Sequence, residues 1–95
     1  MSVTTQSNEA EHPGLELSRI LEARGIVDST VADQGGLSRP LISQITNGNR
    51  RITVNSATKI CKIIGGDPMY WVKRQREHDL WLESEKVRHA VGETV

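Results

Sequence analysis

The sequence predicts an all-α fold, a single five-helix domain with a C-terminal helix extension. Apolar residues recur at helical spacing in five segments, and no segment shows the alternation of a confident strand. Glycine pairs and capping residues separate these segments, so all the connections are short. The chain has 95 residues, which is the length of one domain. A compact helical domain follows from these three observations.

The first helix is expected to open at residues 12–14, where the sequence reads His-Pro-Gly. Proline is tolerated at the first helical position because its missing N–H needs no partner there. We expect His12 to serve in capping or packing at this helix start. Leu17, Ile20 and Leu21 share one face, and Gly25 ends the helix.

The second helix is expected over residues 28–34, with Asp28 as its N-cap. Val31 and Ala32 face inward, and a Gly-Gly pair breaks the helix. The third helix begins after Ser38, a good N-cap, and an Asn-Gly pair at residues 47–48 ends it.

The fourth helix is expected over residues 54–64. Its buried stripe consists of Ala57, Ile60, Cys61 and Ile64. The fifth helix starts at Asp67-Pro68 and extends toward Ala90, with Trp71 as a core residue. Residues 1–11 are polar and are expected to be a disordered tail, residues 12–82 form the domain, and residues 83–95 form the extension or a tail.

Four residues in the middle of the chain form the pattern of a helix-turn-helix. A small residue, Ala32, permits the close crossing of two helices, and Gly36 supplies the positive φ of the turn. Ile42 and Ile45 anchor the second helix to the core and leave its opposite face free. The pattern favours DNA binding over a helical hairpin that binds nothing.

Charge supports the same interpretation. The formal net charge is zero, with 12 basic and 12 acidic side chains. Residues 34–66 nevertheless contain no Asp or Glu, and they carry five basic residues. This basic middle is what a phosphate backbone requires, although a solvated basic face would look the same. The basic residues of this stretch are Arg39, Arg50, Arg51, Lys59 and Lys62.

The third helix is then expected to lie in the major groove. Its exposed side carries the expected base contacts, since arginine suits guanine and glutamine suits adenine. The loop that follows would hold phosphates and set the register. The expected base contacts are Arg39, Ser43 and Gln44, and the expected phosphate contacts are Ser38, Asn49, Arg50, Arg51 and Thr53.

A symmetric operator requires two copies of the chain, so we expect a homodimer on palindromic double-stranded DNA. The C-terminal helix carries more apolar residues than one small core needs, and such a patch indicates an interface. The expected interface residues are Leu80, Trp81, Leu82 and Val87.

Several function classes are disfavoured. No nucleophile–base spacing, phosphate loop or carboxylate pair indicates an enzyme, and no cofactor is expected. The three histidines are scattered and Cys61 is alone, so we expect neither a metal site nor a disulfide. No apolar run or signal core is present, which predicts a cytoplasmic protein without membrane contact.

The chain also resembles the HigA-type antitoxins of the phage-repressor-like (Xre) helix-turn-helix superfamily, over about residues 12–82. The resemblance implies a dimeric repressor of its own operon that neutralises an RNase-type toxin. The acidic N-terminal third would attract a basic toxin. The matching segments are residues 12–14 (His-Pro-Gly), 36–40 (Gly-Leu-Ser-Arg-Pro), 42–43 (Ile-Ser), 47–53 (Asn-Gly-Asn-Arg-Arg-Ile-Thr) and 71–81, between the two tryptophans.

Two alternatives stay open. The first is a stand-alone or phage-encoded regulator without a toxin. The second is a protein-interaction module with weak DNA binding, which Asp28 and Gly35 favour, because an acid near DNA is repelled and a helical glycine weakens its helix.

Overall fold

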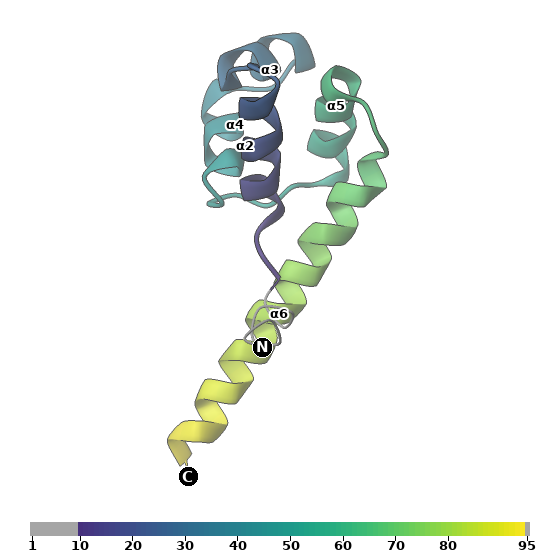
Figure 1. Cartoon of the computed structure of the whole chain (residues 1–95). Helices are drawn as coiled ribbons and strands as arrows, with labels where there is room; N and C mark the ends of the chain where they lie inside the picture. Colours follow the sequence, from purple (N-terminus) through teal and green to yellow (C-terminus); the bar gives the residue numbers. More distant parts are fainter. Residues whose placement is uncertain (1–9, 95) are drawn as a thin grey trace.

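The computed structural model describes residues 10–94, with side chains up to residue 87. Within that range the chain forms five helices, which confirms the predicted fold class (Figure 1). Most of the predicted disordered tail, residues 1–9, lies outside the described residues. The helices are α2 (Pro13–Ala23), α3 (Asp28–Gly35), α4 (Arg39–Thr46), α5 (Val54–Ile64) and α6 (Pro68–Thr94).

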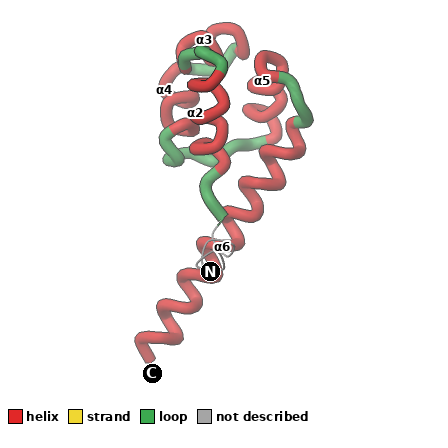
Figure 2. Tube along the Cα trace, viewed as in Figure 1, coloured by secondary structure: helices red, strands yellow, loops and turns green. Residues whose placement is uncertain are grey.

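Helices α2 to α5 form a cluster, and α6 runs along one side of it before continuing away from it (Figures 1 and 2). Helix α3 packs on α4 and α5, while α2 packs on α4 and α6. Every helix contributes to one core. The buried apolar residues are Leu17, Leu21, Val31, Ala32, Ile42, Ile45, Ile52, Ala57, Ile60, Cys61 and Trp71.

Side-chain caps fix the starts of four helices, including α6, where the Asp67 carboxylate accepts a hydrogen bond from the Met69 N–H at 3.0 Å. Nδ1 of His12 accepts a hydrogen bond from the Gly14 N–H at 2.8 Å, so the expected capping role of His12 is confirmed. Ser38 caps α4 as predicted, and Thr53 forms a capping box with Ser56 at the start of α5. These caps satisfy N–H groups that have no partner within a helix.

The first turn of α2 lies against the end of α4. A Cβ placed on Gly14 would lie 1.7 Å from the backbone oxygen of Ile45, so only glycine permits this approach. The His-Pro-Gly sequence therefore combines a cap, a residue suited to a helix start and a close contact between two backbones.

Asp28 is not the N-cap of α3, contrary to the sequence-based expectation. Val27 has the extended backbone of the cap position, and Asp28 is the first helical residue. The carboxylate of Asp28 accepts a hydrogen bond from the hydroxyl of the buried Thr46, at 2.9 Å. It therefore joins the start of α3 to the end of α4.

Helix α6 has two parts with different surroundings. Trp71 and Gln75 are buried against the cluster, which confirms the core role predicted for the tryptophan. Beyond residue 79, large apolar side chains are exposed, and the helix continues four residues past the predicted Ala90. Among the described residues, none of the helices is long and apolar enough to cross a membrane.

Candidate nucleic-acid interface

The turn between α3 and α4 has the geometry of a helix-turn-helix. Gly36 adopts the left-handed conformation with a φ of 71°, and its N–H bonds to the carbonyl of Ala32. Ala32, Ile42 and Ile45 are completely buried. The burial of Ala32, Ile42 and Ile45 and the positive φ of Gly36 agree with the pattern predicted for this motif.

Helix α4 presents a polar face to solvent. Arg39, Ser43 and Gln44, the expected base contacts, are all exposed on it. Arg39 also forms an ion pair with Asp33 of α3, with Nη2 and Oδ2 2.9 Å apart. The three residues are available on one helix face, and their contact with bases stays a prediction.

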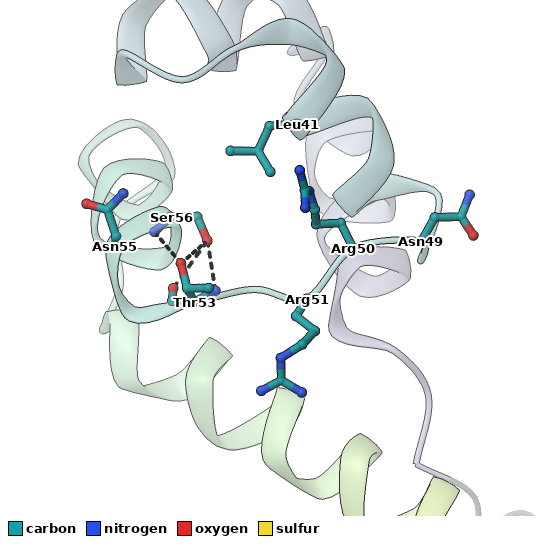
Figure 3. A pocket seen from close by; sticks show the side chains of 7 residues that line it. All are labelled: Leu41, Asn49, Arg50, Arg51, Thr53, Asn55 and Ser56. Atoms are coloured by element: carbon teal, nitrogen blue, oxygen red, sulfur yellow. Dashed lines mark hydrogen bonds between the residues drawn. The ribbon is translucent and has the colours of Figure 1, made fainter.

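An open groove of about 460 Å³ lies between α4, the loop after it and the start of α5 (Figure 3). The side chain of Arg50 points toward Leu41 of α4, whereas Asn49 points away from both. The groove thus joins the exposed face of α4 to a basic side chain and a helix N-terminus, the two features that bind phosphate. Its lining residues are Leu41, Asn49, Arg50, Arg51, Thr53, Asn55 and Ser56.

Asn55 is a groove residue that the sequence-based prediction missed. It is exposed in the first turn of α5, directly after the basic loop. The sequence signal for this role was a polar residue in the first turn of a predicted helix, because backbone N–H groups and side-chain donors in a first turn can bind the same DNA phosphate.

Arg51 differs from Arg50 in its direction. Its side chain points toward α6 and pairs with Asp79 there (Figure 3). Burial raises the pKa of Asp79, but hydrogen bonds from Arg51 and Gln75 outweigh it and leave this pKa below its usual value. The phosphate contact predicted for Arg51 therefore competes with a partner inside the chain.

Gln75 completes this link between α6 and the loop. Its side-chain oxygen accepts a hydrogen bond from the buried Ile52 N–H at 2.8 Å, and its Nε2 donates to Asp79 at 3.0 Å. Gln75 is 2% exposed, so these bonds form away from solvent. Residue 75 is four positions after the buried Trp71, which was the only sequence signal for its burial.

Ser38 and Thr53 are occupied as caps. The Ser38 hydroxyl accepts from the Leu41 N–H at 3.2 Å, and Thr53 exchanges hydrogen bonds with Ser56. Both residues are exposed at the ends of helices that border the interface. Their predicted phosphate contacts stay predictions.

The residues predicted for the dimer interface occupy two faces of α6. Leu80 and Val87 are seven residues apart, which places them on one face, and both are 61% exposed. Leu82 instead lines a hollow of about 200 Å³ with His12 and the loop after α4. Trp81 is half-buried beside His78. Of these four residues, Leu80 and Val87 are the most exposed and share a face, and the role of all four in a dimer interface stays a prediction.

Residues 10 and 11, which were expected to belong to the tail, contact the domain. Nδ1 of His78 lies 2.6 Å from the carbonyl oxygen of Ala10, and Glu11 forms an ion pair with Arg19. Within the described part of the chain, no group of three or more metal-ligating side chains is present.

Comparison with known proteins gives a consistent result. Residues 17–71 match the helix-turn-helix family model HTH_3. The chain is 33% identical over 61 residues to antitoxin HigA-1 of Vibrio cholerae, which covers 64% of this chain and 57% of the antitoxin. The chain spans about three fifths of the length of the first relatives that it matches.

Two solved structures share the fold. One, from Nostoc punctiforme, is described as an antidote protein of a plasmid maintenance system. It is 29% identical with a TM-score of 0.84, over 90% of this chain and 94% of that one. The other, an addiction module antidote protein of the HigA family from Coxiella burnetii, is 24% identical with a TM-score of 0.78, over 92% and 96%.

Proposed function

Because the chain belongs to the HTH_3 helix-turn-helix family, of the Xre type, and has HigA antitoxins among its relatives, we propose that it is an operator-binding repressor and the antitoxin of a two-gene module. One observation carries the DNA-binding part. The exposed polar face of α4 borders a groove that Arg50 and the start of α5 line, within a stretch that contains no acidic residue from 34 to 66.

On DNA, α4 would enter the major groove. Arg39 and Gln44 would read base edges, and Ser43 would contact either strand's bases from the same face. Arg50 and the first turn of α5 would hold a phosphate and fix the register. A second copy, joined through Leu80 and Val87, would read a symmetric half-site about one helical turn away.

Binding to the chain's own promoter tests this part. Arg39→Ala and Gln44→Ala should each weaken operator binding by about 10- to 100-fold and relax the preference at one base pair. Arg50→Ala should weaken binding to every sequence and lower the salt slope by about one unit. Arg76→Ala, on the exposed surface of α6, is the matched control and should change neither.

Equal binding of operator and random DNA by the wild type and all three variants would refute the assignment. The protein-interaction alternative would then be favoured.

The antitoxin part rests on the HigA relatives and on the charge of the N-terminal third. Three of its acids are paired within the chain: Glu11 with Arg19, Glu16 with Arg74 and Asp33 with Arg39. Charge alone therefore assigns no toxin-binding surface. We propose that the partner is a basic RNase-type protein. The product of the gene next to this chain's own gene should therefore co-purify with the chain. A neighbouring product that neither binds nor is toxic would favour a stand-alone regulator.

A further inference from the structure

The ion pair between Asp33 and Arg39 joins the two helices of the helix-turn-helix. Arg39 Nε lies 3.4 Å from Asp33 Oδ1, and Nη2 lies 2.9 Å from Oδ2. The arginine side chain is 67% exposed and the aspartate side chain 60%. Solvent screens such a pair, so it contributes little to the stability of the fold. Because Arg39 lies on the exposed face of α4, the pair can instead affect how that face recognises DNA.

The turn holds both residues at a fixed separation. Gly36 ends α3 in the left-handed conformation, and Ser38 begins α4 by accepting a hydrogen bond from the Leu41 N–H. Asp33 and Arg39 therefore project from rigid helix ends rather than from a mobile loop. A carboxylate placed in this way can restrict the rotamers of a long arginine side chain before DNA arrives.

The geometry leaves one edge of the guanidinium free. An arginine can form paired hydrogen bonds through its side edge, with Nε, or through its end edge, with both terminal nitrogens. Asp33 occupies the side edge. In the described part of the chain, Arg39 Nη1 has no hydrogen-bond partner, so the end edge is open. Guanine presents O6 and N7 in the major groove, and this pair of acceptors matches that edge.

We propose that Asp33 is a positioning residue that makes Arg39 select guanine. This inference rests on the proposed function, because it requires α4 to lie in the major groove. Asp33 also places a negative charge beside the DNA, which weakens attraction to phosphates of any sequence. Its loss should therefore have two opposite effects. Binding to random DNA strengthens, while the preference for guanine at one position falls.

Selection from a pool of random DNA duplexes tests the proposal and does not require the operator to be identified beforehand. The full-length wild type should enrich a symmetric motif with guanine at one position in each half-site. Asp33→Ala should enrich the same motif with that position degenerate, and its preference there should fall by about tenfold. Asp33→Asn removes the charge but keeps one acceptor oxygen, so it should retain part of the preference.

Two controls separate positioning from charge. Glu22→Gln removes an equal charge from the exposed end of α2 and should leave the motif unchanged. In the Arg39→Ala background, Asp33→Ala should cause no further loss of preference, because the residue through which it acts is absent.

The outcomes of the selection are distinct. An Asp33→Ala variant that enriches the wild-type motif, or that binds all sequences more tightly by the same factor, overturns the positioning role. A wild-type protein that enriches no sequence at all contradicts the proposed function itself.

Discussion

Replacing Gly14 with alanine should strongly destabilise the domain. The added Cβ would lie 1.7 Å from the backbone oxygen of Ile45, whereas Cβ atoms stay at least 3.0 Å from such an atom. The start of α2 would have to move by about 1.3 Å, the difference between these two distances. Leu17 and Leu21 of α2 are buried in the same core as Ile45. Movement of α2 would therefore disrupt the close packing of these side chains.

The size of the effect follows from this overlap. Overpacking of a core costs about 1–3 kcal/mol, occasionally more, and a clash with backbone cannot be relieved by a rotamer change. We therefore expect Gly14→Ala to lower the free energy of unfolding by about 3 kcal/mol. For a domain of this length, that corresponds to a decrease in Tm of roughly 12–24 °C.

Gly35→Ala is the matched control, because Gly35 is also helical and has no positive φ. A Cβ there would lie 3.4 Å from Ile63 Cδ1 and 3.6 Å from the Lys59 oxygen, which is ordinary contact. The gain in helix propensity should then raise stability by about 0.5–1 kcal/mol. Thermal and urea unfolding followed by circular dichroism measure both variants. Equal stability of Gly14→Ala and wild type, or equal losses in the two variants, would refute the reasoning.

Three further predictions concern α6 and the cap of α2. Asp79→Asn should release Arg51 and tighten binding to all DNA sequences, by severalfold at low salt, in a filter-binding titration; an unchanged salt slope would contradict this. Leu80→Glu combined with Val87→Glu should give a folded monomer by light scattering, and a persistent dimer would place the interface elsewhere. Burial and the neighbouring His78 lower the pKa of His12 below its usual 6.5. Neutral His12 therefore contributes fully to the stability of the fold above pH 6.5, and this contribution is lost as the pH falls and His12 gains a proton. His12→Asn, which can cap without titrating, should flatten the pH dependence of Tm between about pH 5 and 7, and an unchanged slope would contradict the assignment.

The helices could be predicted because local chemistry marks their ends. Gly36 and Gly65 adopt positive φ, which residues with a side chain rarely do, and Ser38 satisfies an N–H three residues away. Such signals lie within a few positions of the boundary they set. The exposed face of α4 followed from the same periodicity, since Ile42 and Ile45 fix which side is buried.

The contacts that the sequence could not predict join residues far apart in the chain. Asp28 was expected to cap its own helix, but its partner Thr46 is 18 residues away. Arg51 was expected to contact a DNA phosphate, but α6 brings Asp79 beside it from 28 residues away. The sequence alone does not show which acidic and basic side chains pair, because pairing depends on how the helices pack.

The length of α6 also affects how the molecule moves through solution. The Cα radius of gyration of the molecule is 15.4 Å, and its extents are 51 × 29 × 20 Å. A compact chain of this length has a radius of gyration of about 12 Å. The part of α6 that extends away from the cluster adds friction with little added mass (Figure 1). A 10.6 kDa monomer of this shape, as expected of the variant with Leu80→Glu and Val87→Glu, should leave a gel-filtration column ahead of compact proteins of equal mass and sediment more slowly than they do.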